Sequence, residues 1–270
     1  KVVMEIPTYP YDSEYLAGKD LPYLWKDRHN RRKLAGLVDL IAYISDKDYP
    51  SIFGIPAVRI INGIDLSGIQ PREPLIDDTI DICAVANFSK WHGFERLILG
   101  LREYCLQGGT RKFKLHFAGR GLELDRYRQL ASDPLIRDKV IFYDTLSGDA
   151  LDELYNAADF GACSMGLYKT GVQVSSELKS REYLAKGLPV ISGCEIDILS
   201  EKTQDFYQQH PGHPAPIDFR LIVPFYDRIY SRADGFDAQM QAITGFAKAN
   251  IDISVTMQPV INYLSETGAP

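Results

Sequence analysis

From Thr79 onward, short apolar runs alternate with segments in which hydrophobic residues recur at helical spacing. The apolar runs have the length and composition of buried parallel strands, and they lie at 80–86, 114–119, 140–144, 159–165 and 188–193. The periodic segments between them predict helices at 91–107, 122–131, 149–157 and 176–186. This alternation predicts an α/β fold, a doubly wound, Rossmann-like parallel sheet with helices on both faces.

Polar residues and glycines predict where these helices begin and end. Ser147 or Asp149 is expected to cap the helix at 149–157, and Ser175 and Ser176 are expected to cap the helix at 176–186. Gly108, with Gly109 after it, is expected to end the helix at 91–107.

Residues 1–76 are rich in Tyr, Pro and basic side chains and are less regular. Strands are expected near the start of the chain and at Ala57–Ile61, with a turn at Asn62–Gly63. Helical spacing predicts a helix in the second half of 20–44, from Leu34, Leu37, Leu40, Ile41 and Ile44. Two prolines and little periodicity in SGIQPREPLIDD indicate a linker. The chain therefore divides into 1–76, 77–234 and 235–270, the last segment being predicted as one or two amphipathic helices.

Composition narrows the class of protein. The chain is 45% hydrophobic and 24% charged, as is ordinary for a globular protein, and its net charge of −6 does not favour nucleic acid as a partner. The four cysteines contain no Cys-x-x-Cys pair, which favours buried free thiols in a reducing compartment. There is no signal-peptide pattern and no apolar run near the roughly 20 residues that span a bilayer. We expect a cytoplasmic protein. Because the chain begins at Lys1, it could be a processed form or a fragment.

Ligands of an open parallel sheet bind outside the carboxyl ends of the strands, so the loops there are candidates. One of them, Gly119-Arg120-Gly121, follows a strand and precedes a helix, but Leu124 stands where a dinucleotide fingerprint has its third glycine. A tight turn is one reading. The other is a phosphate contact, made by close backbone approach at Gly119 and by the charge of Arg120.

The loop NFSKWHG places Lys90 and His92 beside Gly93 at a predicted helix start. The free N–H groups of a helix amino terminus attract anions, and the two side chains add to that attraction. The alternative is a solvated lysine and a histidine used for capping or packing.

The stretch SSELKSREYLAKGLPVI places Lys179 and Glu182 three residues apart, on one face of a predicted helix. The helix start could hold a phosphate, and Glu182 could accept hydrogen bonds from two adjacent hydroxyls such as those of ribose. A structural Lys–Glu pair explains the same spacing, and the residues alone leave both readings open.

Taken in order, these motifs resemble the donor-binding domain of glycosyltransferases with the GT-B fold, in the bacterial group 1 enzymes (family 4). The resemblance covers about residues 79–230 and rests on SKWHG, FAGRG, VIFYDTLSGDALDELYNAADFGACS and REYLAKGLPVI. EIPTYPYDSEY and the FGIP…INGID stretch resemble the end of the amino-terminal acceptor domain. The resemblance therefore implies a donor domain at 77–234 and a partial acceptor domain with its linker at 1–76, the start of that domain being absent.

The resemblance also implies roles for single residues, with departures from the family pattern. Glu182 matches the second glutamate of the E-x7-E signature, but Val174 occupies the position of the first, so either Glu177 substitutes or the sugar hydroxyls are held differently. The Leu178-Lys179 pair that precedes Glu182 is similar to the variant of this motif in a subset of the family, the capsule and exopolysaccharide enzymes. Asn87 and His92 stand where an Arg and a Lys usually clamp the diphosphate, so Lys90 or Arg120 is expected to supply charge. The catalytic residues expected are Lys179, Glu182 and His92, and the donor-binding residues are Asn87, Ser89, Lys90, Gly93, Gly119, Arg120, Tyr143, Thr145, Ser175, Ser176 and Leu178.

The resulting hypothesis is a glycosyltransferase that moves a sugar from a nucleotide sugar, with uracil as the first choice of base, to a glycan or lipid-linked acceptor. Retention of configuration is implied by the resemblance. Metal independence and the absence of a cofactor are expected because no convincing Asp-x-Asp loop occurs. The alternatives are a non-catalytic nucleotide-sugar-binding fragment and a GT-B nucleotide-sugar epimerase.

A basic stretch, WKDRHNRRK, holds five Lys/Arg and one Asp beside aromatic residues. Such a stretch can dock on anionic lipid, which suggests peripheral contact through Lys26–Lys33 with the inner face of the plasma membrane. A solvated helix face explains it equally well.

Overall fold

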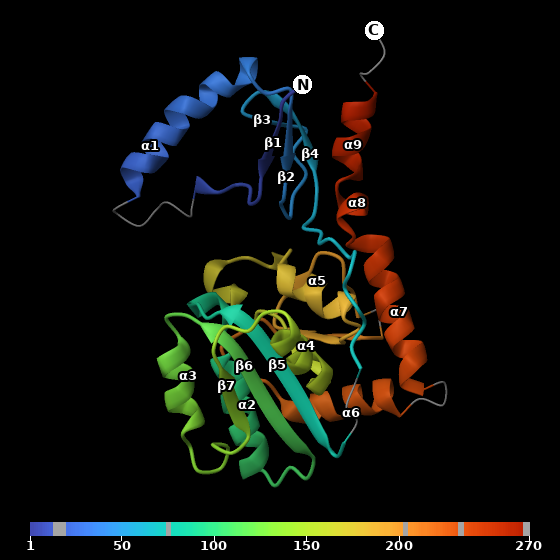
Figure 1. Cartoon of the computed structure of the whole chain (residues 1–270). Coiled ribbons are helices and arrows are strands. Elements are labelled where there is room, and N and C mark those ends of the chain that lie inside the picture. Colours follow the sequence, from blue (N-terminus) through green and yellow to red (C-terminus); the bar gives the residue numbers. More distant parts are fainter. Residues whose placement is uncertain (13–19, 74–76, 202–204, 232–234, 267–270) are drawn as a thin grey trace. The chain divides into compact units, whose positions relative to one another are not determined.

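The computed structural model describes residues 1–12, 20–73, 77–201, 205–231 and 235–266 (Figure 1). The chain forms two compact units, one of residues 1–65 and 251–270 and a larger one of residues 66–250. Residues 235–250, grouped above with the carboxyl-terminal helices, lie in the larger unit. Within the described residues, no helix is long and apolar enough to cross a membrane.

The larger unit is built on a six-stranded parallel sheet (Figure 1). Its strands, in spatial order, are β12 (Tyr207–Gln209), β10 (Val190–Ser192), β8 (Phe160–Ala162), β5 (Thr79–Asn87), β6 (Lys112–Arg120) and β7 (Val140–Tyr143). This confirms the predicted doubly wound fold. A two-stranded ladder of β9 (Val174–Ser175) and β11 (Glu195–Ile196) was not expected, and neither was β12.

Helices cover both faces of the sheet, because successive side chains along each strand point to opposite faces and both sets are largely apolar. Ile80, Ile82 and Ala84 of β5 share one core with α2 (Glu95–Leu106), α3 (Leu124–Ala131) and α6 (Phe219–Tyr230). The intervening residues point the other way, toward α5 (Leu178–Ala185). There the hydroxyl oxygen of Tyr183 accepts a 3.1 Å hydrogen bond from the backbone N–H of Val85. α4 (Asp149–Ala157) contacts β5, and α7 (Gly235–Asn250) packs on α5.

The order of the strands places a topological switch between β5 and β8. The chain runs from β5 through β6 to β7 on one side, then crosses back to β8, β10 and β12 on the other. The loops that follow β5 and β8 therefore diverge at the carboxyl edge of the sheet, where ligands of such folds bind.

Two predicted helix caps are wrong. Gly148, with φ of 55°, is the N-cap of α4, so neither Ser147 nor Asp149 has this role. Glu177 is the N-cap of α5, because Ser175 belongs to β9 and the helix begins only at Leu178. In both places sequence propensity for a cap was overridden by the path of the preceding loop.

The smaller unit holds a four-stranded sheet with β1 (Val3–Ile6), β2 (Leu40–Tyr43), β4 (Ile55–Arg59) and β3 (Ser51–Ile52) in that order. Beside the sheet, the chain forms α1 (Leu21–Asn30), the 3₁₀ helix η2 (Arg31–Gly36), α8 (Ile253–Thr256) and α9 (Gln258–Ser265). The predicted helix in the second half of 20–44 is wrong. Leu40–Tyr43 is a central strand buried on both faces, and such a strand is apolar at every position and can mimic helical spacing.

The expected turn at Asn62–Gly63 is also wrong, because no turn forms there. Ile64 instead bridges Asp252 in parallel, and a Cβ atom on Gly63 would lie 2.2 Å from Oγ1 of Thr256. Glycine is required there for close approach and not for a turn. The four cysteines are free, as predicted, and Cys83, Cys163 and Cys194 are buried.

Candidate functional site

The loops after β5 and β8 meet at the switch point. The 3₁₀ helix η3 (Lys90–His92) follows β5, and its N-cap Ser89 donates a backbone N–H bond of 3.0 Å to Nδ1 of His92. The carbonyl of His92 accepts a 2.7 Å bond from the N–H of Met165, just after β8. Gly93 has φ of 62°, and a Cβ atom there would lie 2.6 Å from Gly166. The two loops are thus locked by backbone contact, which only glycine allows.

A charged cluster lies at this junction. Glu177 accepts bonds from the Ser164 backbone N–H at 3.0 Å and from its hydroxyl at 2.8 Å. Nζ of Lys179 lies 2.8 Å from Oε2 of Glu177, and both side chains are only 12% exposed. The same ammonium lies 5.8 Å from the centre of the Phe94 ring. Lys179 therefore pairs with Glu177, and a Lys179–Glu182 ion pair does not form.

The cluster fixes the protonation state of its members. Burial alone would raise the pKa of Glu177, but Lys179 and the Ser164 hydrogen bonds outweigh it and lower the pKa, so the carboxylate is ionised. Burial and the charge of Lys179 lower the pKa of His92 to about 4. His92 is therefore neutral near pH 7. Because Nδ1 accepts the Ser89 bond, the ring proton sits on Nε2, which can donate to a ligand.

A pocket of about 360 Å³ lies beside the cluster, at the carboxyl ends of β5, β6 and β7. Four predicted donor-binding residues line it, together with apolar neighbours: Asn87, Gly119, Arg120 and Thr145, with Val85, Ala86, Ala118 and Leu146. Its lining is mostly apolar with a few polar groups, as in pockets for flat heterocycles. Arg120 is the single cationic side chain among the residues that line it.

The glycines of Gly119-Arg120-Gly121 bring the ends of β5 and β6 together. A Cβ atom on Gly119 would lie 2.0 Å from the carbonyl oxygen of Ala86, and one on Gly121 would lie 2.3 Å from that of Phe88. Gly119 has φ of 136° and Gly121 has φ of 138°, a backbone conformation in which a side chain would be strained. This loop is a tight turn that also forms one wall of the pocket.

Other predicted site residues make contacts of their own. Glu182 accepts a 3.0 Å bond from the hydroxyl of Tyr155 on α4, and it is partly exposed. Ser175 is buried in β9, and Ser176 accepts a bond of 3.1 Å from buried Arg181. Leu178 is 50% exposed at the start of α5.

Two further predicted residues also lie at the carboxyl edge. Lys90 is exposed in η3, and its carbonyl accepts a 3.0 Å bond from Nζ of Lys169. Tyr143 ends β7 and joins a buried chain of polar groups, in which His116 lies 3.0 Å from the Tyr143 hydroxyl and 2.6 Å from Asp81. Sequence reasoning missed Ser164 and the Asp81–His116 pair. Polar residues inside apolar strands were the available signal, since burial of such groups requires partners.

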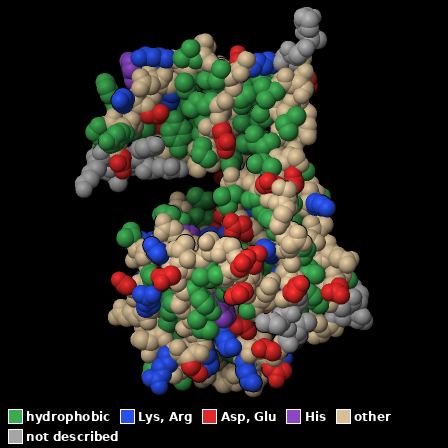
Figure 2. All heavy atoms as spheres, in the orientation of Figure 1, with side chains coloured by type: hydrophobic (Ala, Val, Ile, Leu, Met, Phe, Trp, Pro, Cys, Tyr) green, Lys and Arg blue, Asp and Glu red, His purple; other side chains and the backbone are tan. Residues whose placement is uncertain are grey.

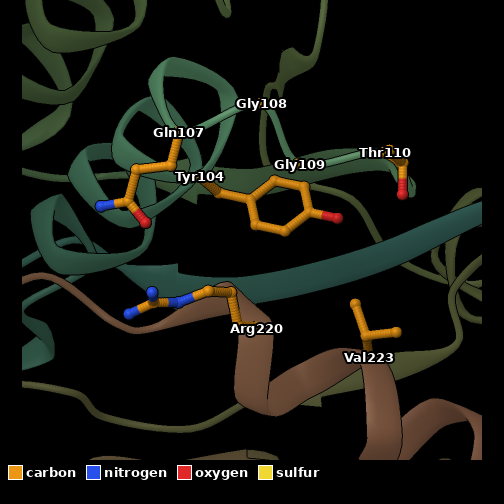
Figure 3. Close-up of a pocket in the computed structure, with 7 residues that line it drawn as sticks. All are labelled: Tyr104, Gln107, Gly108, Gly109, Thr110, Arg220 and Val223. Carbon is orange, nitrogen blue, oxygen red and sulfur yellow. The ribbon is translucent and has the colours of Figure 1, made fainter.

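A second pocket, of about 440 Å³, lies at the opposite edge of the sheet. Tyr104 and Gln107 of α2 and Arg220 of α6 face it, and Gly108, Gly109, Thr110 and Val223 complete its lining (Figure 3). Arg220 is neutralised there by Asp218, 2.9 Å away. This pocket lies near the amino end of β6, so it is far from the switch point in the topology of the sheet.

The charged side chains on the visible face of the larger unit do not gather into a patch of one sign (Figure 2). Figure 2 shows acidic and basic side chains interspersed over the visible face of the larger unit. Among the residues that the structure describes, no group of three or more His, Cys, Asp or Glu side chains is placed to hold a metal ion.

Comparison with known proteins finds a family model that matches part of the chain. Residues 68–201 match the family model described as "Glycosyl transferases group 1". No curated protein matches the chain significantly. The matched residues include the switch point, the charged cluster and the pocket beside it.

Solved structures share the fold at low sequence identity. A glycosyltransferase from Rickettsia africae ESF-5 is 12% identical with a TM-score of 0.66, covering 99% of this chain and 78% of that protein. Anabaena Alr3699/HepE in complex with UDP is 14% identical with a TM-score of 0.65, covering 98% and 72%. WaaG, a glycosyltransferase involved in lipopolysaccharide biosynthesis, is 15% identical with a TM-score of 0.61, covering 99% and 75%. These similarities show that the chain has the GT-B fold.

Proposed function

We propose that this protein transfers a sugar from a nucleotide sugar, a UDP-sugar in the first instance, to a glycan or lipid-linked acceptor. The observation that carries the proposal is the Lys179–Glu177 pair at the switch point, next to neutral His92 and within the matched family domain. The matched family model is described as "Glycosyl transferases group 1", and the structurally similar HepE was crystallised with UDP, which supports a UDP-sugar as the donor.

Each group has a task in this proposal. The uracil enters the pocket between β5 and β7, where Asn87 and Thr145 offer polar atoms. Lys179 and the Nε2–H of His92 face the leaving diphosphate, whose charge grows as the glycosidic bond breaks. Fixed donors and a cation in a partly buried site stabilise such charge, so we propose transfer without a metal ion. Glu182, oriented by Tyr155, accepts bonds from the ribose diol.

Retention of anomeric configuration and an acceptor used in polysaccharide assembly are further parts of the proposal. They rest on the family match and on WaaG, which acts in lipopolysaccharide biosynthesis. Glu177 does not take the place of a sugar ligand here, because its oxygens are occupied by Ser164 and Lys179.

The acceptor side of the proposal includes peripheral contact with anionic lipid at the cytoplasmic face of the membrane. In α1, Tyr23 and Trp25 are 68% and 75% exposed. Arg28 and Arg31 are paired with Asp12, at 2.7 and 2.8 Å, which leaves Lys26, Arg32 and Lys33 as the cations of this stretch for lipid. Aromatic side chains beside unpaired cations suit an anionic interface.

The test is calorimetric titration of UDP and GDP into the protein, into Glu182→Ala and into the control Glu153→Ala, an exposed glutamate on α4. We expect saturable UDP binding that weakens in Glu182→Ala only. Absence of UDP binding to the wild type would overturn the proposal.

Product analysis with a UDP-sugar then separates the classes of activity. A transferase releases UDP and forms a new glycoside, an epimerase alters the sugar while it stays on the nucleotide, and a binding fragment gives neither product. Full turnover in EDTA is expected, and turnover that EDTA abolishes and a divalent metal restores would overturn metal independence.

A further inference from the structure

One wall of the nucleotide pocket follows a short edge strand. β7 has four residues and lies at the end of the six-stranded sheet, so it pairs with β6 alone. Thr145 and Leu146, which come just after β7, line the pocket and are called the β7 wall below. A short strand bonded on one side opens locally at a low free-energy cost, and the loop that follows opens with it. The shape of the β7 wall therefore depends on contacts outside the ladder.

Three polar side chains on three strands provide such a contact. Nε2 of His116 on β6 lies 2.6 Å from Oδ1 of Asp81 on β5, and Nδ1 lies 3.0 Å from the hydroxyl of Tyr143, the last residue of β7. Asp81 and His116 are 8% and 6% exposed. The rings of His116 and Tyr143 also stack, with centroids 5.9 Å apart. These three side chains, called the β7 anchor below, tie the end of β7 to β5, which is not its neighbour in the sheet.

The β7 anchor leads to the pocket along one face of the sheet. His116 pairs with Cys83 in the ladder, and Ala118, two residues later, pairs with both Val85 and Tyr143. Because side chains alternate along a strand, all of these residues share a face. Val85 and Ala118 line the pocket. The anchor thus runs diagonally toward the carboxyl edge and ends beside the lining of the pocket.

The hydrogen bonds of the β7 anchor have a defined direction. A carboxylate only accepts, so the bond to Asp81 places a ring proton on Nε2 of His116. In the neutral ring, Nδ1 then offers a lone pair, and the hydroxyl of Tyr143 donates to it. This bond orients the side chain at the end of β7, which an apolar contact in the same place would not do.

The inner end of the anchor is itself fixed. The backbone N–H of Asp81 donates a 2.8 Å bond to Oδ2 of Asp159, and the N–H of Asp159 donates a 2.7 Å bond to the carbonyl of Asp81. Asp159 directly precedes β8, so the anchor starts from the centre of the sheet. A rigid base and a directed chain of bonds together hold one position of Tyr143.

We propose that Asp81, His116 and Tyr143 are positioning residues that preform the β7 wall before the nucleotide binds. The inference rests on the proposed function, which assigns this pocket to the uracil. These three described residues are outside the pocket lining, so they act through the β7 wall and not by touching the ligand. A preformed wall raises affinity because less conformational freedom is lost on binding.

The first experiment is calorimetric titration of UDP into Tyr143→Phe, which removes the hydroxyl and keeps the ring. Tyr104→Phe is the matched control, because the Tyr104 hydroxyl also makes a 3.0 Å bond, with the backbone N–H of Arg111 at the amino edge of the sheet. We expect UDP binding to be about fivefold weaker in Tyr143→Phe, as for the loss of one hydrogen bond, and unchanged in Tyr104→Phe.

The second measurement is amide hydrogen exchange over residues 140–148 of the ligand-free protein, followed by mass spectrometry. Tyr143→Phe should raise the exchange rate there about fivefold, because local opening becomes easier by one hydrogen bond, and saturating UDP should restore protection. A role in overall stability alone would instead raise exchange throughout the sheet, and would do so equally in Tyr104→Phe.

His116→Gln tests the middle of the β7 anchor. The glutamine amide takes a position near that of Nε2 and can still donate to Asp81, so the bond that is lost is the one to Tyr143. We expect the same weakening of UDP binding as in Tyr143→Phe, and no further loss when the two changes are combined, since both break one link. Losses that add would show that Tyr143 does not act through His116.

Unchanged UDP affinity in Tyr143→Phe, or an equal loss in Tyr104→Phe, would overturn the proposal. Failure of the proposed function is a separate result, because it appears as absence of UDP binding to the wild type. The exchange rates of the ligand-free variants still decide the role of the anchor in that case. Unchanged exchange over 140–148 in Tyr143→Phe would show that the β7 anchor does not hold the β7 wall.

Discussion

Lys179 pairs with Glu177, two residues before it in the chain, with Nζ 2.8 Å from Oε2. Its other acidic neighbour, Glu182, bonds Tyr155 instead. The two glutamates therefore have separate partners, Glu177 the ammonium of Lys179 at the switch point and Glu182 the hydroxyl of Tyr155 on α4. This division is the basis of the first two predictions.

Glu177→Gln should destabilise the protein by roughly 3 kcal/mol at pH 7, because it leaves a mostly buried ammonium without its counter-charge. The pKa of Glu177 lies below its ordinary value of 4.5, so the stabilisation by its charge is present above that pH and is lost as the pH falls through the lowered value. Urea unfolding between pH 3 and pH 8 should show a difference from wild type that is constant above pH 6 and shrinks below pH 4.5. A difference that persists at pH 3 would contradict this account, and Glu153→Gln serves as the control.

Tyr155→Phe should weaken UDP binding about fivefold, because one hydrogen bond that orients Glu182 contributes roughly 1 kcal/mol. Glu182→Ala should weaken it more. Calorimetry on the two variants and on the double variant measures their coupling. If the effects simply add, Tyr155 does not act through Glu182.

His92 should make the protein less stable in mild acid. Burial lowers its pKa in the folded state to about 4, whereas the unfolded chain takes up the proton near 6.5. The unfolding free energy therefore falls between pH 6.5 and pH 4, and His92→Asn should flatten that fall. Buried His210, whose pKa is also lowered to about 4 by burial, contributes in the same direction, so some slope remains. An unchanged slope in His92→Asn would show that His92 does not titrate in this way.

Gly93→Ala should cost roughly 2 kcal/mol or more, because a side chain at φ of 62° is strained and its Cβ atom would collide with Gly166 at 2.6 Å. Nucleotide binding should fall as well, since this contact joins the loops of the site. The matched control is Gly245→Ala in the exposed part of α7, where nothing lies within 4 Å. That change should stabilise the protein by about 0.5–1 kcal/mol. Equal thermal shifts for the two variants would contradict the packing argument.

Binding to vesicles of phosphatidylethanolamine and phosphatidylglycerol should fall in a Lys26→Glu, Arg32→Glu variant. Each cation near an anionic surface contributes about 1 kcal/mol, so a loss of at least tenfold is expected in sedimentation assays. Arg31→Glu is a less clean test, because Arg31 bonds Asp12 and its reversal would disturb the fold. Arg137→Glu, exposed on the larger unit, is the control. Equal binding by all variants would remove the membrane contact.

The sequence by itself determined the architecture of the larger unit. Alternation of apolar runs with helical periodicity gave five of the strands and most of the helices, because burial on both faces imposes that pattern on every strand. The loops of the site were also predictable, since the carboxyl edge follows from a parallel sheet. In the smaller unit the same pattern led to a wrong prediction of a helix. The strand Leu40–Tyr43 is buried at every position, so it lacks the alternation of polar and apolar residues that would distinguish it from a helix.

Only the tertiary structure decided which side chains meet. The loops after β5 and β8 lie far apart in the sequence, and their contact depends on strand order and on Gly93 facing Gly166. Glu177 became the partner of Lys179 because α5 begins two residues later than its serines suggested, which turns that carboxylate toward Ser164. Spacing along a helix fixes which residues share a face, but partners across loops are set by packing, which the local sequence does not encode.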